Sequence, residues 1–386
     1  MSKATISDAV KYIGADDTDL DLFEGQYIIP NGISYNSYVI LDDKIAVLDT
    51  VDARKTDEWL ANLEATLCGK TPDYLIINHM EPDHAANVNL LMDKYPTLTG
   101  VCNQKAADMM NRFFGTDYSG RLMIVKERDT LALGSHTLQF FMAPMVHWPE
   151  AMVTFEQSEG ILFSADAFGK FGALSAQEDW TCEARRYYFN ICGKYGAPVQ
   201  TLLKKAATLH INTICPLHGP ILKENLGYYI SLYNTWSSYK PENEGIFIAY
   251  CSMHGNTANA ANRLAEIIRS KSDVKVSTAD LARDDMAEAL EDAFRYDRLV
   301  LACPTYDGDI MPVMHDFLQH LKAKNYQNRK VAFIENGSWA PVAGRKMKEA
   351  MQQMKDITLV DPVVTVESTV KADTISQLTS LAEALI

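Results

Sequence analysis

The sequence lacks paired cysteines. Its seven cysteines are widely spaced and form no C-x-x-C pair: Cys68, Cys102, Cys182, Cys192, Cys215, Cys251 and Cys303. A fused rubredoxin-type iron site or a zinc ribbon would need such pairs, so both are excluded. The odd count and the wide spacing indicate reduced thiols, which are typical of the cytoplasm. We therefore expect a cytoplasmic protein.

The sequence also lacks a long apolar run and an excess of basic charge. No run approaches the length of a membrane-spanning helix, and Met1–Asp17 lacks the apolar core of a signal peptide. The formal net charge of -14 argues against nucleic acid or an anionic membrane surface as the main partner, because both attract basic patches. We expect neither a nucleic acid nor a membrane among the partners.

The length of the chain favours two domains. Its 386 residues are 47% hydrophobic and 22% charged, which leaves enough apolar material for two cores. The stretch Ser237–Gly245 (SSYKPENEG) is polar, contains a proline and has no periodicity, so it is the candidate linker. We predict domains over residues 1–243 and 244–386.

The first domain is predicted to combine strands with later helices. Its strand-like runs are Ile33–Ile40, Lys44–Asp49, Asp73–Asn78, Leu122–Lys126, His136–Met142, Met152–Phe155 and Ile161–Ser164. A turn at Asp42-Asp43 joins the first two runs as a hairpin. Helical spacing covers Ala85–Lys94, Cys182–Ile191 and Val199–Leu209. This order suits an αββα sandwich or another layered α/β fold.

The second domain alternates strands with helices. Its strand-like runs are Ile246–Tyr250, Val274–Ser277, Leu299–Ala302, Val331–Ile334 and Val363–Val366. Helical stretches separate them, beginning with Thr257–Ser270 and ending with Thr374–Ile386. Such alternation implies right-handed βαβ units and a parallel sheet. Five strands match a flavodoxin-like, doubly wound sheet.

A dense group of metal-binding residue types follows the strand-like run Asp73–Asn78. It reads H-x-E-x-D-H and consists of His79, Glu81, Asp83 and His84. Imidazole and carboxylate together suit zinc, iron or manganese. In a tight loop the first two side chains can point one way and the last two another, so one loop can serve two metals. The alternative is a loop of turn residues and satisfied polar groups, which the density of the group disfavours.

Further ligands must come from elsewhere in the chain. The candidates each follow an apolar, strand-like run, where a rigid element can aim a side chain: His147, Asp166 and His218. A carboxylate such as Asp166 could bridge two metals. Each of these residues taken singly could be structural, and the weight comes from the whole set in this order. The remaining histidines fit surface or helix positions and are not expected to be ligands: His136, His210, His315 and His320.

The metal-binding residues resemble the metallo-β-lactamase superfamily, whose hydrolases carry H-x-H-x-D-H followed by His, Asp and His. This chain has Glu81 where the hydrolases have their second His, and that exchange is the distinguishing mark of the flavodiiron proteins. An added carboxylate makes the site harder and more anionic, which favours iron over zinc. Two further segments look like segments of that family: HWPE (His147–Glu150) and RRYYFNI (Arg185–Ile191).

The resemblance implies a ligand set for two irons. One iron would be held by His79, Glu81 and His147. The other would be held by Asp83, His84 and His218, and Asp166 would bridge the two. The family varies in whether its first His reaches the metal, so His79 need not be a ligand in every redox state.

Three loops of the second domain point to a flavin. The loop after Ile246–Tyr250 is rich in hydroxyls and glycine and precedes a helix, so it offers backbone N–H groups and a helix dipole to a phosphate. Neither a P-loop motif nor G-x-G-x-x-G occurs, and the small loop suits a monophosphate such as FMN. The candidates are Ser252, Met253, His254, Gly255, Asn256 and Thr257. An ordinary capped helix start is the alternative.

The other two loops lie beyond the carboxyl ends of predicted strands, where doubly wound sheets bind ligands. Their candidates are Pro304, Thr305, Tyr306, Asp307, Gly308, Asn336, Gly337, Ser338, Trp339 and Ala340. Tyr306 and Trp339 could stack on a flavin ring or only pack against the domain surface. The three loops resemble the FMN loops of flavodoxin and of the flavodoxin-like half of flavodiiron proteins. The resemblance thus covers nearly the whole chain, as a metallo-β-lactamase-like αββα sandwich followed by a flavodoxin-like parallel sheet.

The resemblance implies a reductase of O2, of NO or of both, with electrons relayed through FMN to a diiron site. O2 would become water and NO would become N2O. A separate donor is expected, either rubredoxin or, in some relatives, reduced F420. Because the two sites lie on separate domains, we expect a head-to-tail homodimer or a dimer of dimers. The rivals are a zinc hydrolase with a flavodoxin-like regulatory domain and a pure electron carrier with a structural first domain.

Overall fold

The computed structural model describes residues 6–386, which divide into two compact units. The first unit runs to Tyr188 and also includes Ala197–Asn234, and the second comprises Phe189–Gly196 and Thr235–Ile386. The domain limit between residues 243 and 244 stays a prediction. Within residues 6–386 no helix is both long enough and apolar enough to cross a membrane.

The first unit is built on two sheets. The six-stranded sheet consists of β1 (Val10–Tyr12), β6 (Tyr38–Ile40), β7 (Ala46–Leu48), β8 (Tyr74–Ile76), β9 (Thr99–Cys102) and β10 (Leu122–Ile124), in that order. The five-stranded sheet consists of β11 (Thr130–Ala132), β12 (Thr137–Met142), β13 (Met152–Glu156), β14 (Ile161–Phe163) and β15 (Thr213–Cys215). Two short pairs are separate: β2 (Ala15–Asp17) with β5 (Ile33–Tyr35), and β3 (Leu22–Phe23) with β4 (Tyr27–Ile28).

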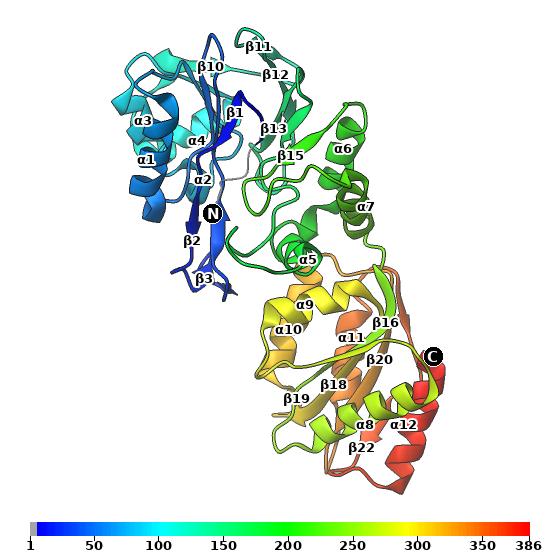
Figure 1. Cartoon of the computed structure of the whole chain (residues 1–386). Coiled ribbons are helices and arrows are strands. Elements are labelled where there is room, and N and C mark those ends of the chain that lie inside the picture. The colour runs from blue at the N-terminus through cyan, green and yellow to red at the C-terminus, as the bar shows by residue number, and fades with distance from the viewer. Residues whose placement is uncertain (1–5) are drawn as a thin grey trace. The chain divides into compact units, whose positions relative to one another are not determined.

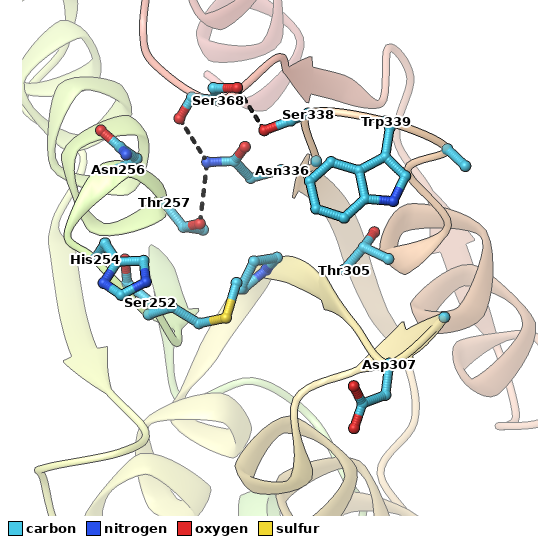
Figure 2. Close-up of a pocket in the computed structure, with 15 residues that line it drawn as sticks. Ser252, His254, Asn256, Thr257, Thr305, Asp307, Asn336, Ser338, Trp339 and Ser368 are labelled. Carbon is cyan, nitrogen blue, oxygen red and sulfur yellow. Dashed lines mark hydrogen bonds between the residues drawn. The ribbon is translucent and has the colours of Figure 1, made fainter.

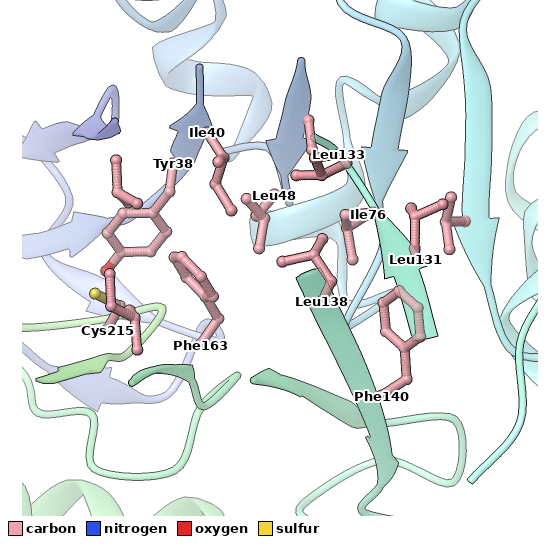
Figure 3. Packing of buried hydrophobic residues seen from close by; sticks show 14 of the residues in the cluster. Tyr38, Ile40, Leu48, Ile76, Leu131, Leu133, Leu138, Phe140, Phe163 and Cys215 are labelled. Carbon is pink, nitrogen blue, oxygen red and sulfur yellow. The ribbon is translucent and has the colours of Figure 1, made fainter. Parts of the chain in front are cut away.

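The two sheets pack face to face around an apolar core. Tyr38 and Leu48 from the first sheet and Phe140 and Phe163 from the second belong to one buried cluster (Figure 3). Helices α1 (Thr56–Leu67), α3 (Val88–Lys94) and α4 (Gln104–Phe114) lie on the outer side of the first sheet (Figure 1). The later helices are α5 (Trp180–Ile191), α6 (Gly196–Ala206) and α7 (Leu226–Ser237). The predicted αββα sandwich is confirmed.

Helix α4 shows how local sequence sets an element of this unit. The side chain of Asn103 accepts a hydrogen bond from the Ala106 N–H and so caps the amino end. Ala106 and Met110 lie four residues apart and are buried together on one face. Gly115 ends the helix at a left-handed φ of 64°, a conformation that glycine adopts without strain.

Two predicted elements of this unit are broken in the structure. The predicted strand Ile33–Ile40 divides at Asn36, whose side-chain amide donates to the carbonyls of Pro216 and Gly219 at 2.8 Å each. The predicted helix Ala85–Lys94 begins earlier and is split into α2 (Pro82–Ala85) and α3. Pro82 occupies the first turn of α2, where a proline costs no hydrogen bond, so it starts that helix.

The second unit contains one mainly parallel sheet. Its strands are β17 (Val276–Asp280), β16 (Asn243–Tyr250), β18 (Tyr296–Tyr306), β20 (Arg329–Asn336), β21 (Ile357–Leu359) and β22 (Val364–Val366), with β19 (Asp309–Ile310) added antiparallel to β18. β21 and β22 pair with successive parts of β20, so together they take the place of a fifth strand. The resulting order, 2-1-3-4-5, is that of flavodoxin-like folds, and the predicted fold is confirmed.

Helices cover both faces of this sheet. α8 (Asn256–Lys271) and α12 (Ala372–Leu385) pack on one face, and α9 (Met286–Arg295), α10 (Pro312–Ala323) and α11 (Ala343–Met351) belong to the other (Figure 1). Ile248, Leu264 and Leu381 are fully buried within the α8–α12 face. Because β16, β18 and β20 run parallel, the loops at their carboxyl ends gather at one edge of the sheet.

Candidate functional site

A short loop and the first turn of α2 present the four residues of the H-x-E-x-D-H segment. Glu81 precedes α2 with extended backbone angles (φ -62°, ψ 139°), whereas Asp83 and His84 lie inside the helix. The ligand atoms of His79 and Glu81 belong to one group, and those of Asp83 and His84 belong to another. The predicted division of this loop into two pairs is therefore what the structure has.

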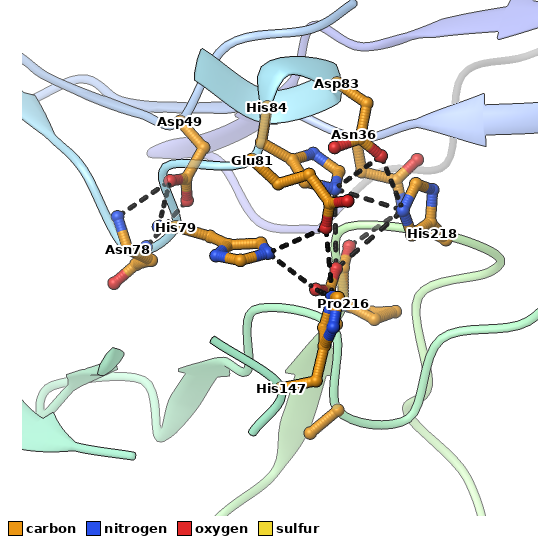
Figure 4. Close-up of polar contacts among 12 residues, drawn as sticks. Asn36, Asp49, Asn78, His79, Glu81, Asp83, His84, His147, Pro216 and His218 are labelled. Carbon is orange, nitrogen blue, oxygen red and sulfur yellow. Dashed lines mark hydrogen bonds and ion pairs between the residues drawn. The ribbon is translucent and has the colours of Figure 1, made fainter. Parts of the chain in front are cut away.

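The first group of ligand atoms comes from His79, Glu81, His147 and Asp166, and these atoms lie within 4.8 Å of one another. Glu81 Oε2 is 3.2 Å from His79 Nε2 and 3.0 Å from His147 Nε2. Asp166 Oδ2 is 3.1 Å from His79 Nε2 and 3.2 Å from His147 Nε2. Figure 4 shows His79, Glu81 and His147 pointing toward one another.

The second group comprises Asp83, His84 and His218. Asp83 Oδ2 is 3.2 Å from the Nε2 atoms of both His84 and His218, and those two nitrogens are 3.0 Å apart. Asp166 reaches this group through its other oxygen, because Oδ1 lies 3.4 Å from His84 Nε2. One carboxylate thus faces both groups, as a bridging ligand would.

The carboxylates of this cluster are suited to cations. All four carboxylate oxygens of Asp83 and Asp166 are buried, and the partners that face them within residues 6–386 are the imidazole nitrogens of the cluster. Buried carboxylates normally need several partners. Imidazole nitrogens and carboxylate oxygens converging on two points form the donor set that iron, zinc and manganese accept. The residues present fit two such ions.

The charges of the cluster support this interpretation. Burial would lower the pKa of His84, but Asp83 and Asp166 outweigh burial and raise that pKa to about 10. Burial would likewise lower the pKa of His147, but the hydrogen bonds that its ring donates to Asp166 and Glu81 outweigh burial and raise that pKa to about 9. Despite its burial, the histidines hold the pKa of Asp166 well below its usual range. At neutral pH, protons on these imidazoles occupy positions that a metal would take.

Neighbouring residues orient the histidines. Glu150 Oε1 lies 2.8 Å from His79 Nδ1 and accepts the Met80 N–H at 2.9 Å. His218 Nδ1 donates to the Ser34 carbonyl at 2.7 Å. Each bond places the ring proton on Nδ1 and leaves Nε2 free to face the cluster. The sequence placed Glu150 in the HWPE segment without indicating its role. The role of Ser34 was not predicted.

A buried carboxylate also holds the loop itself. Asp49 Oδ1 accepts the Asn78 N–H at 2.7 Å, and its Oδ2 accepts the Asn78 side-chain amide at 2.7 Å. Asn78 Oδ1 in turn accepts the Thr154 hydroxyl at 2.7 Å. Asp49 ends the predicted strand Lys44–Asp49, and that position was the only signal in the sequence for its role.

The other histidines lie outside the cluster, but one differs from its prediction. His210 and His315 are exposed, and His320 is partly exposed. His136 is buried rather than at the surface or in a helix, because its ring pairs with two carboxylates between β11 and β12. Its Nδ1 is 2.7 Å from Asp42 Oδ2, and its Nε2 is 3.2 Å from Glu159 Oε1.

A cavity of about 460 Å³ opens at the sheet edge of the second unit (Figure 2). Loops after β16, β18 and β20 line it through residues predicted from the sequence: Ser252, Met253, His254, Asn256, Thr257, Pro304, Thr305, Asp307, Gly308, Asn336, Gly337, Ser338, Trp339 and Ala340. Gly255 and Tyr306 are not among the lining residues. Ser368, after β22, is a lining residue that was missed, although its loop follows the last strand-like run at the same edge.

Hydrogen bonds tie these loops together. Asn336 Nδ2 donates to the Ser368 carbonyl at 3.2 Å and to the Thr257 hydroxyl at 3.4 Å (Figure 2). The Ser338 and Ser368 hydroxyls are 2.6 Å apart. Thr305 Oγ1 accepts the Val342 N–H at 2.9 Å and so anchors the third loop to the second.

The cavity has the chemistry that a flavin mononucleotide needs. No side chain caps the amino end of α8, so its first N–H groups remain available to a phosphate. Trp339 is 82% exposed on the cavity rim, where a planar ring could stack on it. The residues present therefore fit FMN.

Comparisons with known proteins identify the same two domains. The family model described as "ODP family beta lactamase" matches residues 33–219, and the model described as "Flavodoxin domain" matches residues 247–365. The chain is 30% identical to a nitric oxide reductase of Moorella thermoacetica, over 94% of this chain and 92% of that protein. It is 28% identical to an anaerobic nitric oxide reductase flavorubredoxin of Vibrio vulnificus, over 86% of this chain and 70% of that protein.

Solved structures extend the similarity to the whole fold. The rubredoxin oxygen:oxidoreductase of the anaerobe Desulfovibrio gigas superposes with a TM-score of 0.92 at 25% identity, covering 99% of this chain and 97% of that chain. The flavodiiron protein of Giardia intestinalis has the same fold, with a TM-score of 0.90 at 24% identity over 98% of this chain and 96% of that chain. Both domain models, a relative at 30% identity and these folds lead to one conclusion. This chain belongs to the flavodiiron protein family.

Proposed function

We propose that the protein reduces O2 to water, NO to N2O, or both, at a diiron centre that receives electrons through FMN. The observation that carries this proposal is the pair of ligand groups that share Asp166. Two neighbouring irons, when bound there, would supply the redox chemistry that the reduction of O2 or of a pair of NO molecules needs. The names of the relatives, a nitric oxide reductase and an oxygen oxidoreductase, support the same two substrates.

The ligand assignment is part of this proposal. His79, Glu81 and His147 would hold one iron, and Asp83, His84 and His218 the other. Asp166 would bridge them through its two oxygens. Glu81 adds a third carboxylate to the cluster, and this negative charge favours iron over zinc.

The chain's own residues prepare the centre for the reaction. When bound, iron and FMN supply the storage of electrons and the binding of the gas. Aromatic rings exclude water around His218: the ring centroids of Phe23 and Tyr187 lie 5.4 and 5.6 Å from its own. Glu150 and the Ser34 carbonyl hold the imidazoles in one orientation, so the ligand atoms need not rearrange when a substrate arrives.

The electron donor and the assembly are further parts of this proposal, and the assembly follows from the location of the two sites in separate units. We propose that electrons come from a separate carrier such as rubredoxin, or reduced F420 as an alternative. We further propose a head-to-tail homodimer, or a dimer of such dimers, in which FMN of one chain serves the irons of its partner. Sedimentation during turnover tests this assembly, and a strictly monomeric active protein would contradict it. A cytoplasmic location stays a prediction.

The function is tested on anaerobically reduced protein with separate electrodes for O2 and NO. We expect consumption of at least one gas, with four electrons used per O2 or one per NO, and no release of peroxide. His84→Asn should abolish consumption, whereas His210→Asn, which changes an exposed histidine outside the cluster, should leave it unchanged. Two zinc ions and no iron per chain, together with no gas consumption, would instead indicate a hydrolase.

A further inference from the structure

Two cysteines lie together beneath the FMN cavity, and the proposed reaction uses neither of them. Cys251 follows β16 and Cys303 lies in β18. Each directly precedes a lining residue of the cavity, Ser252 in one loop and Pro304 in the other. Both are free thiols, and both are fully buried. Their sulfurs touch, with 3.4 Å between the two Sγ atoms.

The backbone places the two residues as cross-strand neighbours. β16 and β18 pair in parallel with Tyr250 opposite Ala302, so Cys251 and Cys303 form the next pair in register. The Cys251 N–H donates to the Ala302 carbonyl at 3.0 Å and keeps the strands paired up to this point. Neighbouring strands are about 4.8 Å apart, which lies within the Cα separation of about 4.4–6.8 Å that a disulfide requires. Bond formation therefore requires the sulfurs to close from 3.4 Å to the disulfide length of about 2.05 Å.

The surroundings make the two sulfurs unequal. Cys251 donates its S–H to Cys303 Sγ, and the Met311 N–H donates to the same sulfur at 3.4 Å, while the Cys303 S–H donates to the Pro304 carbonyl at 3.3 Å. The hydrogen bond to Cys303, followed by burial, raises the pKa of the Cys251 thiol. Met311 is the residue that precedes α10, so its N–H lies at the positive end of that helix. Two donors thus point at Cys303 Sγ, which makes Cys303 the candidate attacking sulfur and Cys251 its partner in the second step.

We propose that Cys251 and Cys303 form a reversible dithiol–disulfide site that reacts with small peroxides such as hydrogen peroxide. In the first step Cys303 sulfur attacks one peroxide oxygen, the O–O bond breaks, and sulfenic acid and one water form. In the second step Cys251 sulfur attacks the sulfenic sulfur, the S–O bond breaks, and a second water leaves as the disulfide forms. Two thiols and one peroxide thus give one disulfide and two waters.

This site would give the flavin domain a store of two electrons and two protons that is independent of FMN and iron. Because the loops to the cavity begin at the very next residues, the two buried sulfurs lie one residue behind the lining that a peroxide formed by incomplete O2 reduction near the flavin would reach. The site itself does not depend on the proposed gas reduction, since its chemistry involves only the two side chains and the peroxide.

The test is a titration of the FMN-loaded protein with hydrogen peroxide, followed by denaturation, alkylation and peptide mass spectrometry. The exposed Cys68 serves as an internal measure of the dose, because its sulfenic acid can be trapped with dimedone. We expect two alkylatable thiols to be lost in addition to Cys68 as a linked peptide pair containing Cys251 and Cys303 appears. Dithiothreitol should restore both thiols.

Matched variants separate this site from general cysteine oxidation. Cys303→Ser keeps an acceptor for the Met311 N–H and should abolish the linked pair, and Cys251→Ala provides a second, independent loss. Cys102→Ser removes another fully buried cysteine and should leave the linked pair unchanged. If no linked pair forms at a dose that fully oxidises Cys68, or if Cys303 is joined to a different cysteine, the proposal is wrong.

Discussion

Replacing Glu150 by glutamine should weaken iron binding without touching a ligand. Glu150 is 1% exposed, and its Oε1 lies 2.8 Å from His79 Nδ1 and 2.9 Å from the Met80 nitrogen. Glutamine keeps the shape and an acceptor oxygen but removes the charge. A hydrogen bond to a charged group contributes about 1.5–3 kcal/mol, against about 0.5–1.5 kcal/mol for a neutral one. The loss at His79 is therefore about 1 kcal/mol.

That free energy corresponds to a drop in iron affinity of about fivefold, since 1.4 kcal/mol is tenfold. Glu150→Ala removes the acceptor altogether and should cost about 10- to 100-fold, as changes next to metal-binding histidines generally do. The measurement is anaerobic competition for Fe(II) against a chromophoric chelator of known affinity. Binding constants for the parent and both variants come from the same titration.

Glu156→Gln is the matched control. Glu156 is also fully buried, and it accepts two backbone N–H groups, from Ser158 at 2.8 Å and from Glu159 at 2.7 Å. It makes no contact with the cluster among the hydrogen bonds and ion pairs of residues 6–386. If Glu150→Ala binds iron as tightly as Glu156→Gln does, then Glu150 does not orient His79 for a metal, and the reasoning fails.

Three further predictions test other parts of the molecule. Trp339→Ala should weaken FMN binding about 2- to 10-fold, because about 0.5–1.5 kcal/mol of stacking is lost, and fluorescence titration with FMN measures this effect. The melting midpoint should stay unchanged, because the ring is 82% exposed. Burial lowers the pKa of His136, but Asp42 and Glu159 outweigh burial and raise it. The two ion pairs therefore stabilise the folded protein fully below the unfolded-state pKa near 6.5, and this stabilisation is lost as the pH rises through the pKa of the folded state. His136→Asn should therefore lower stability by about 1.5–3 kcal/mol at pH 6 and by less at pH 9, and equal losses in thermal melts at both pH values would contradict this. After metal removal, iron must displace protons from His84 and His147, whose pKa values are raised to about 10 and about 9. The affinity for iron should therefore increase about tenfold per pH unit for each proton displaced between pH 6 and 8. A chelator competition that gives a pH-independent binding constant for iron would refute this prediction.

The parts of the site that could be predicted are those encoded by short segments. His79 to His84 lie within six consecutive positions, so their proximity needs no knowledge of the fold. The cavity loops each follow a strand-like run, and parallel strands bring such loops to one edge. Local sequence and strand order were sufficient to place these residues near one another.

The parts that could not be predicted depend on contacts between distant segments. Glu150 lies 71 positions from His79, and Asn36 lies 180 positions from Pro216, whose carbonyl it contacts. His136 was misplaced for the same reason, because Asp42 is 94 positions away. Hydrophobic periodicity reports which face of an element is buried, and it carries no information about which polar partner lies opposite.

The carboxylate of Asp166 also has a consequence for how metal enters the protein. Asp166 directs one carboxylate oxygen toward each ligand group, so a single ion can coordinate only one of the two oxygens. The first ion to bind also fixes the Asp166 rotamer that the second ion needs. Loading should therefore be cooperative. When iron is scarce, a population of chains would then divide into empty and doubly filled molecules, and singly filled chains would be few.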